Sequence, residues 1–260
     1  MPSFLWSMGY KMLRTTVVLL TLAAIAFAAP TSDDIYNNVV IGDIDGAVAK
    51  SKELQKQGKG DIITEAVNRL IRDSQRNTME YAYQLWSLEA RDIVKERFPI
   101  QFRMMLGEHS IKLINKRDNL AMKLGVATDN SGDRIAYGAA DDKTSDRVAW
   151  KFVPLSEDKR VYFKILNVQR GQYLKLGVET DSDGEHMAYA SSGADTFRHQ
   201  WYLQPAKADG NLVFFIVNRE YNHALKLGRS VDSMGDRQVW GHNGNVIGNP
   251  ELFGWSVVAF

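Results

Sequence analysis

The fold is decided by residues 115–137, NKRDNLAMKLGVATDNSGDRIAY, because the chain repeats their pattern twice more. Residues 167–189 read NVQRGQYLKLGVETDSDGEHMAY, and residues 218–240 read NREYNHALKLGRSVDSMGDRQVW. Each of these three stretches begins with Asn, contains Lys-Leu-Gly, continues with an Asp-x-x-Gly turn and ends with an aromatic residue. The leading Asn residues are 52 and then 51 residues apart. A period near fifty with preserved turn chemistry indicates one supersecondary unit used three times.

Each copy carries signals for four short β-strands. An alternating apolar run opens the copy, the Lys-Leu-Gly and the aromatic residue lie in the second and third strands, and a tryptophan lies in the fourth. Twelve short strands with threefold repetition predict a β-trefoil, a sheet that closes on itself and so removes edges that favour aggregation. We place this domain at residues 108–260, with repeats at about 109–160, 161–210 and 211–260.

Asp129, Asp181 and Asp232 begin the turn between the second and third strands of the three copies. A glycine follows three residues later in every copy. Asp at the start of a type I turn, with Gly in the left-handed position after it, is typical of a hairpin. The alternative is calcium binding, but these segments lack the distal Glu and the length of a calcium loop. We therefore interpret them as turns.

Lys123, Lys175 and Lys226 occupy one equivalent position in the second strand. Apolar residues flank each lysine, so alternation along the strand predicts that the apolar pair faces the core and the lysine faces solvent. The alternative is a ring of three lysines that binds an anion.

Trp150, Trp201 and Trp255 close the three copies. Aromatic residues that recur at equivalent positions bury large areas around a threefold axis. We interpret these tryptophans as core, and not as platforms for a ligand.

The aromatic residue of the third strand differs between the copies. Tyr137 and Tyr189 share a strand face with an apolar residue, whereas Trp240 shares its face with Gln238. An indole among planar polar groups suits a sugar, because the indole stacks on the ring while polar groups bind the hydroxyls. We predict a sugar-binding site in the third copy; the alternative is an ordinary solvent-facing hairpin. The candidate residues are Asp232, Arg237, Gln238, Trp240, His242, Asn243 and Asn245.

Residues 29–107 have the pattern of helices. Apolar residues recur with a period of 3.6, most clearly over 61–73, and Gly58 to Gly60 and Pro99 mark helix ends. The pattern predicts four to six short helices in a small all-α bundle. The expected fold class is therefore α+β with two domains, each with its own core: a helical bundle followed by a β-trefoil.

Bulky apolar side chains gather in the second half of the helical segment. Short helices that carry methionine can reshape around an acyl chain, because the methionine side chain is flexible. We predict that a bound lipid or fatty acid lies in the helical domain or at its junction with the trefoil. The alternative is that these residues only fill the bundle core. The candidate residues are Trp86, Phe102, Met104 and Met105.

The first residues have the pattern of a secretory signal peptide. Lys11 and Arg14 precede an uncharged run over residues 15–29, which contains Ala26-Phe27-Ala28, a small-x-small cleavage pattern. The alternative is a membrane anchor, but the run is short for a span of roughly 20 residues. We predict that residues 1–28 are removed and that the mature protein is secreted.

Composition and motifs exclude several classes of function. A formal net charge of +1 produces no field that would gather nucleic acid. The chain has no Cys, no G-x-S-x-G and no H-E-x-x-H, and its five His show no metal-ligand spacing. We therefore predict a protein that is not an enzyme, holds no cofactor or metal, and does not bind nucleic acid or span a membrane.

Three features together resemble the low-molecular-weight, thirty-kilodalton lipoproteins of silkworm haemolymph. They are the signal peptide ending in Ala-Phe-Ala-Ala-Pro, the segment DDIYNNVVIGD at residues 33–43, and the Lys-Leu-Gly repeats. The resemblance covers the whole chain, and residues 33–43 are its most specific part. It implies a VHS-like N-terminal helical domain packed on a C-terminal β-trefoil. It also implies synthesis in fat body, uptake by other tissues through a cell-surface receptor, and no agreed catalytic residues.

Lipid carriage and the binding of glucans or other sugars in immune recognition are attributed to members of that family. The resemblance and the sequence together predict a secreted, monomeric haemolymph protein that stores and carries lipid without catalytic activity. The alternative is a carbohydrate (glucan)-binding recognition protein of insect immunity that acts through the trefoil. Ricin-type trefoil lectins place an Asp well upstream of the pocket aromatic. The corresponding position before Trp240 is Leu225, so a sugar site here must be built differently.

Overall fold

The computed structural model describes residues 29–139, 144–193 and 196–260. Ser32–Phe260 forms one compact unit. The expected signal peptide, residues 1–28, lies outside the described residues. Among the residues that are described, no helix is both long enough and apolar enough to cross a membrane.

Short helices form the N-terminal part of this unit. Asp43 caps the second of them, because its side chain accepts a hydrogen bond from the Gly46 amide at 3.0 Å. Pro99 directly precedes the last, where its missing amide hydrogen costs nothing. The helix bounds are α2 Ser32–Ile41, α3 Ile44–Lys56, α4 Gly60–Arg72, α5 Thr78–Ser87, α6 Arg91–Arg97 and α7 Ile100–Leu106.

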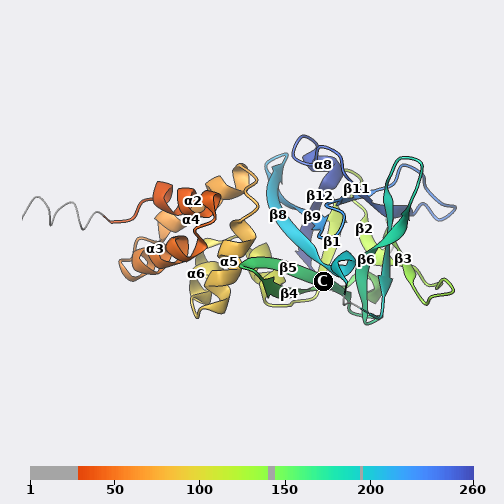
Figure 1. The fold of residues 1–260 in the computed structure, drawn as a ribbon, viewed down its shortest axis with the longest axis horizontal. Coiled ribbons are helices and arrows are strands. Elements are labelled where there is room, and N and C mark those ends of the chain that lie inside the picture. Colours follow the sequence, from red (N-terminus) through yellow and green to blue (C-terminus); the bar gives the residue numbers. More distant parts are fainter. Residues whose placement is uncertain (1–28, 140–143, 194–195) are drawn as a thin grey trace, which may run out of the picture. The chain divides into compact units, whose positions relative to one another are not determined.

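The described residues after Gly107 form one antiparallel sheet of twelve strands (Figure 1). Its first six strands are β1 Ile111–Asn115, β2 Ala121–Leu124, β3 Arg134–Ala139, β4 Trp150–Glu157, β5 Arg160–Asn167 and β6 Gln172–Thr180. The next six are β7 His186–Ser191, β8 Trp201–Ala208, β9 Asn211–Asn218, β10 Ala224–Leu227, β11 Arg237–His242 and β12 Gly254–Ala259. A short helix, α8 Pro250–Phe253, precedes the last strand.

The strand pairing repeats three times. Six strands close into a ring in the order β1, β4, β5, β8, β9, β12 and back to β1. The other strands form the hairpins β2–β3, β6–β7 and β10–β11, and β3, β7 and β11 pair with one another. We call the end of the sheet made by these three hairpins the hairpin face. The arrangement is trefoil-like, and it follows the threefold repetition of the sequence.

The expected fold class, a separate VHS-like bundle followed by a β-trefoil domain, is wrong. Ser32–Phe260 is one compact unit, and a single hydrophobic core contains residues of both the helices and the sheet. The Phe102 ring of α7 meets the Phe214 ring of β9 edge-on, with centroids 5.5 Å apart. Helices this short owe most of their stability to packing, and here their apolar faces pack on the sheet as well as on one another.

The VHS-like shape was implied by the family resemblance alone, and no periodicity in the sequence requires it. The expectation of two separable cores, one in the helices and one in the sheet, is wrong for the same reason, because the two parts share one core. The proposed division into residues 29–107 and 108–260 falls between the end of α7 and the start of β1, and it stays a proposal.

The tryptophans of the three repeats lie in the core, as predicted. Trp150, Trp201 and Trp255 are fully buried. Each indole N–H donates a hydrogen bond to a backbone oxygen of the preceding hairpin, which a buried indole needs. The acceptors are Met122, Leu174 and Leu225, at 2.8, 3.0 and 3.0 Å.

The Asp-x-x-Gly segments form hairpin turns, which confirms their interpretation. Oδ1 of Asp129, Asp181 and Asp232 accepts hydrogen bonds from the backbone amides two and four residues later, at 2.8–2.9 Å. The turn glycines adopt the left-handed backbone that glycine takes without strain. Gly132, Gly184 and Gly235 have φ angles of +81°, +74° and +81°.

Candidate functional site

The repeated lysines join neighbouring repeats on the hairpin face. Each pairs with the acidic residue that directly follows a turn glycine of another repeat. The three lysine side chains are 7–13 % exposed, so the prediction that they face solvent is wrong. Removing one partner of such a pair would leave the other charge buried, which is costly. The Nζ-to-oxygen distances are 2.6 Å for Lys123–Asp236, 2.5 Å for Lys175–Asp133 and 2.7 Å for Lys226–Glu185.

The aromatic residue of each hairpin packs on the glycine of its Lys-Leu-Gly. A Cβ added to Gly125, Gly177 or Gly228 would lie 3.0–3.1 Å from the ring opposite it, so a larger residue would displace the ring. The rings are half-buried and lie opposite a residue of the next hairpin. These pairs are Tyr137 with Gln238, Tyr189 with Ile135, and Trp240 with Met187.

A groove that we call the polar groove runs beside Trp240 on the hairpin face and has a volume of about 410 Å³. The hairpin of the third repeat and the turn of the second repeat build it. An indole, a planar amide and charged groups of both signs converge there, which suits a polyhydroxylated ligand. It is lined by Asp181, Asp183, Glu185, Lys226, Gly228, Arg229, Ser230, Gln238, Trp240 and His242.

Three of the seven predicted sugar-site residues, Gln238, Trp240 and His242, line the polar groove. Arg237 supports the edge of the groove without lining it. Its Nη1 donates hydrogen bonds to the backbone oxygens of Gly228, at 3.1 Å, and of Arg229, at 2.5 Å.

The other three predicted residues lie elsewhere. Asp232 holds the turn of the third repeat and borders a different groove. Asn243 and Asn245 are exposed in the loop after β11, and Asn245 Oδ1 accepts a hydrogen bond from the Gly248 amide at 2.9 Å. The sugar site stays a prediction. The predicted residues that the structure brings together are the three that line the polar groove.

Glu185 is the charged centre of the polar groove. Its Oε1 lies 2.7 Å from Lys226 Nζ and 2.9 Å from His242 Nδ1. Behind it, burial lowers the pKa of His223, and the nearby His186 and His242 lower it further. Although histidines and a carboxylate gather here, no group of His, Cys, Asp or Glu within the described ranges is arranged to hold a metal ion.

A second groove, which we call the apolar groove, occupies the equivalent place between the first and third repeats. Its volume is about 560 Å³. Ile135 stands where the polar groove has Gln238, and Met234 stands where it has Asp183. The lining is Lys123, Gly125, Val126, Ala127, Thr128, Asp129, Asp133, Ile135, Tyr137, Arg147, Tyr189, Asp232, Met234 and Asp236.

The tyrosines of the apolar groove lie in a negative field. Burial raises the pKa of Tyr137 above its usual value, and the neighbouring Asp232 raises it further. Burial is also the main cause of the raised pKa of Tyr189, followed by Asp129. Both hydroxyls therefore stay protonated and neutral near pH 7.

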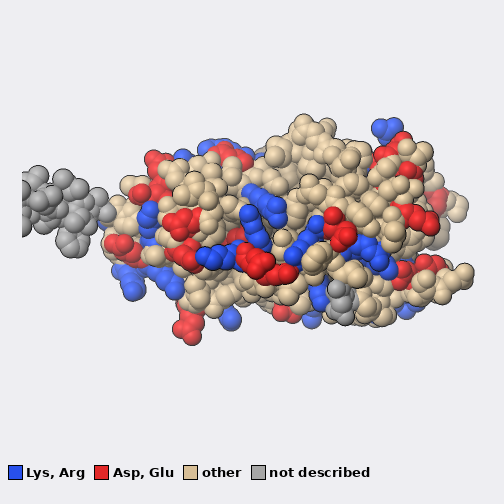
Figure 2. All heavy atoms as spheres, viewed as in Figure 1, with Lys and Arg blue, Asp and Glu red and all other residues tan. Residues whose placement is uncertain are grey.

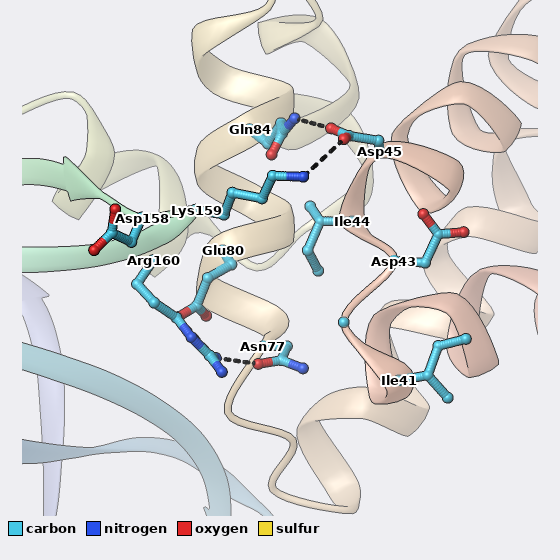
Figure 3. A pocket seen from close by; sticks show the side chains of 11 residues that line it. Ile41, Asp43, Ile44, Asp45, Asn77, Glu80, Gln84, Asp158, Lys159 and Arg160 are labelled. Carbon is cyan, nitrogen blue, oxygen red and sulfur yellow. Dashed lines mark hydrogen bonds and ion pairs between the residues drawn. The ribbon is translucent and has the colours of Figure 1, made fainter.

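A third pocket, of about 410 Å³, lies between the helices and the β4–β5 hairpin (Figure 3). Arg160 reaches across it, donating a hydrogen bond from Nη1 to Asn77 Oδ1 at 2.8 Å and lying 3.8 Å from Glu80 Oε1. Lys159, at the hairpin tip, lies 3.8 Å from Asp45 Oδ2. These contacts tie the hairpin to the helices, so the polar groups of this pocket largely bind one another.

Glu80 should make folding stability depend on pH. Burial raises the pKa of this carboxyl above 4.5, against smaller lowering effects of its own backbone amide, Arg76 and Arg160. The folded state therefore binds the proton more tightly than the unfolded state, and stability should fall as pH rises from 4.5 through the raised value. We expect Glu80→Gln to raise the denaturant midpoint near pH 7 and to flatten its pH dependence.

Denaturant melts between pH 4.5 and 7.5 measure this effect. Glu65→Gln, an exposed position on α4, is the matched control and should keep the wild-type slope. A pH profile that Glu80→Gln leaves unchanged would show that Glu80 is not the titrating group.

The predicted lipid-site residues lie in and around the shared core. Phe102, Met104 and Met105 are buried, and Phe102 packs between Phe98 and the sheet. Trp86 is half-buried, with the Arg91 guanidinium 5.4 Å from its ring centroid. A lipid could reach Phe102, Met104 and Met105 only if the helices moved apart. The role of all four residues in lipid binding stays a prediction.

The contribution of the second repeat to the polar groove was not predicted. Its acidic residues reach Trp240 because β7 pairs with β11, and local patterns do not encode pairing between repeats. A signal was present, because an acidic residue follows the turn glycine in every copy. A repeated acid and a repeated lysine indicate a repeated ion pair. The recurring acids are Asp133, Glu185 and Asp236.

On the face shown in Figure 2, basic and acidic side chains lie interspersed over the helices and the sheet. The formal net charge of +1 agrees with this mixture. This face therefore has no large field of one sign that would gather a polyanion.

Comparison with known proteins establishes the family. The model of the lepidopteran low molecular weight (30 kD) lipoprotein family matches residues 30–259. Low molecular mass lipoprotein 3 of Bombyx mori is 48 % identical over 256 residues, which cover 95 % of this chain and all of that protein. Low molecular mass lipoprotein PBMHP-6 of Bombyx mori is 44 % identical over 258 residues, with the same coverage.

Among solved structures, a Caenorhabditis elegans protein of unknown function aligns with a TM-score of 0.45 and 13 % identity. The alignment covers 58 % of this chain and 94 % of that one. Because the family model spans nearly all of the described residues and two relatives match end to end, this chain belongs to the lepidopteran low molecular weight (30 kD) lipoprotein family.

Proposed function

We propose that this protein is secreted into haemolymph, where it carries lipid and serves as a reserve without catalysing a reaction. The observation that supports this best is the identity of 44–48 % to two silkworm proteins named as lipoproteins, each matched over its full length. The signal-peptide pattern of residues 1–28 supports secretion. Circulation as a monomer and uptake through a cell-surface receptor belong to the same proposal.

The lipid would lie in the helical part or where that part meets the sheet. Two features support this location. Met104 and Met105 have flexible side chains that can repack around an acyl chain. A pocket of about 350 Å³ also opens where α5 meets the β4–β5 hairpin, with Tyr83, Leu88 and Val161 among its lining residues. Leu88 is 46 % exposed there, although it is a large apolar side chain.

Photo-cross-linking in the intact mature chain tests this location. The delipidated protein would be irradiated with a long-chain fatty acid that carries a diazirine, then digested, and the labelled peptides identified by mass spectrometry. We expect saturable labelling within residues 78–106, and displacement of the label by unlabelled fatty acid. Label confined to residues 115–139 and 224–242 would contradict the helical location, and the absence of saturable label would contradict fatty-acid carriage.

The polar groove supports carbohydrate recognition as a second candidate function. Trp240 offers an aromatic surface, and Gln238, His242 and the acidic turn of the second repeat offer groups for hydroxyls. Gln238, Trp240 and His242 are only half-buried, so they can meet a ligand in the groove. A glucan is the sugar class that we propose.

Trp240→Ala should weaken glucan binding at least about tenfold, roughly 1.4 kcal/mol, because it removes the stacking surface. Tyr137→Ala and Tyr189→Ala should leave glucan affinity unchanged, since neither ring lines the polar groove. Titration calorimetry with a soluble β-1,3-glucan measures this, and circular dichroism checks that each variant is folded. Equal losses for all three variants, or no binding by the wild type, would remove the second function.

A further inference from the structure

The apolar groove combines two aromatic rings, apolar walls and an excess of carboxylates. We propose that it binds the trimethylammonium group of a cationic or zwitterionic amphiphile between Tyr137 and Tyr189. This inference rests on the proposed lipid carriage for its choice of an amphiphile. The recognition of the ammonium group itself is argued from the groove alone.

The two rings suit a quaternary ammonium ion. Such an ion has no N–H to donate, and it is attracted to the negative face of an aromatic ring, best where water is partly excluded. Tyr137 and Tyr189 both line the groove and are half-buried. Tyr137 belongs to β3 of the first hairpin, and Tyr189 belongs to β7 of the second. The pairing of β3 with β7 places Tyr189 opposite Ile135. Two different hairpins therefore bring the rings to one groove.

The charges around the rings favour a cation. Four carboxylates line the groove against two cations, Lys123 and Arg147. Lys123 is paired with Asp236, and Asp133 is paired with Lys175 outside the lining. With Lys175 counted, four carboxylates face three cations, so the groove keeps a net negative charge, and the two carboxylates outside these ion pairs belong to the turns.

Asp129 and Asp232 are those carboxylates, and both are fixed in position. Each uses Oδ1 to accept two backbone amides of its own turn, and Oδ2 takes no part in those hydrogen bonds. Asp232 raises the pKa of Tyr137 and Asp129 raises the pKa of Tyr189, so each carboxylate acts on a ring of the pair. A preorganised negative site costs little to assemble when the ligand arrives.

The apolar walls favour a ligand with a hydrocarbon chain. Val126 is 66 % exposed and Met234 is 78 % exposed at this groove. A hydrocarbon chain that covers such apolar side chains removes their surface from water, which is favourable. Ile135 adds a third apolar surface. The equivalent polar groove has Gln238 and Asp183 at the matching places, so the two grooves differ in the ligands that they suit.

Calorimetry on the intact, delipidated mature chain tests the proposal with decyltrimethylammonium, decanoate and choline as probes. We expect decyltrimethylammonium to bind one molecule per chain, and choline to bind more weakly because it lacks the chain. Tyr137→Leu combined with Tyr189→Leu should weaken decyltrimethylammonium about tenfold, while the affinity for decanoate stays unchanged. The corresponding double change to Phe keeps both ring faces and should bind like the wild type.

Two further variants serve as a charge test and a matched control. Asp232→Asn keeps the oxygen that caps the turn and removes the charge, so it should weaken decyltrimethylammonium several-fold without unfolding the hairpin. Trp240→Leu changes the equivalent ring of the polar groove and should have no effect. If choline binds as tightly as the amphiphile, ammonium recognition stands and the ligand is a small soluble ammonium compound.

Equal losses of decyltrimethylammonium and decanoate in the Leu variant would show a merely apolar groove and would overturn the inference. So would an unchanged affinity for the cation in both the Leu and Asn variants. If those negative results occur while native protein still contains lipid, lipid carriage stands and the ammonium site fails. If the native protein contains no lipid but the variants behave as expected, the carriage proposal fails and the ammonium site stands.

Discussion

Trp201→Ala should lower the free energy of unfolding by about 3–5 kcal/mol. Trp201 is fully buried at the start of β8, and its indole N–H donates to the Leu174 oxygen at 3.0 Å. The substitution therefore removes a large apolar side chain, leaves a cavity in the threefold core and removes a buried hydrogen-bond donor to the Leu174 carbonyl. Chemical denaturation followed by circular dichroism measures the loss.

Trp240→Ala is the matched control, because Trp240 is half-buried on the hairpin face. It should cost clearly less stability than Trp201→Ala. A loss under about 1 kcal/mol for Trp201→Ala would show that the repeated tryptophans do not form the core.

Phe102→Ala should also lower the free energy of unfolding by about 3–5 kcal/mol. Phe102 is fully buried between Phe98 of the helical part and Phe214 of the sheet, with ring centroids 5.4 and 5.5 Å away. Because the core is shared, we expect the far-UV signal of the helices and the tryptophan fluorescence of the sheet to change in one transition, at a lower denaturant concentration than in the wild type.

Ile100→Ala provides the control on the same helix, since Ile100 is 52 % exposed and should cost little stability. Two separate transitions in the wild type, with Phe102→Ala shifting only the helical one, would support two independent cores and contradict the shared one.

The sequence predicted most where chemistry is local and repeated. Asp129 and its equivalents hold the turns as expected, because an Asp followed by Gly three residues later determines a turn without help from distant residues. Trp150, Trp201 and Trp255 are core because a large apolar group that recurs three times has few other places in a closed sheet. The threefold repetition also predicted the twelve strands of the sheet.

The sequence predicted less where the outcome depends on contacts between repeats. Lys123 lies between apolar neighbours, so alternation points its side chain away from the core and into solvent. The turn of the third repeat instead covers it and supplies Asp236. The same kind of contact brings the turn of the second repeat to Trp240. Asn243 and Asn245 lie in the exposed loop after β11 and do not line the polar groove. The sequence near these residues does not indicate either contact between repeats, apart from the acidic residue that follows each turn glycine.

The helical part was predicted as a set of elements but not as an arrangement. The apolar face of α4, with Ile63, Val67 and Leu70, is buried as its periodicity predicts. The periodicity does not show what such a face packs against, because an apolar helix face packs equally well on another helix or on a sheet. The core joins the helices to β4, β5 and β9, so the separate VHS-like bundle was the wrong arrangement.

The proposed role as a lipid carrier is tested most directly by what the native protein holds. The protein would be purified from haemolymph without detergent or organic solvent, extracted with chloroform and methanol, and the extract quantified by mass spectrometry against protein content. We predict lipid in roughly equimolar amount, absent from an equal mass of a control haemolymph protein taken through the same steps. A native protein that yields no lipid above that control would contradict the proposed role as a lipid carrier.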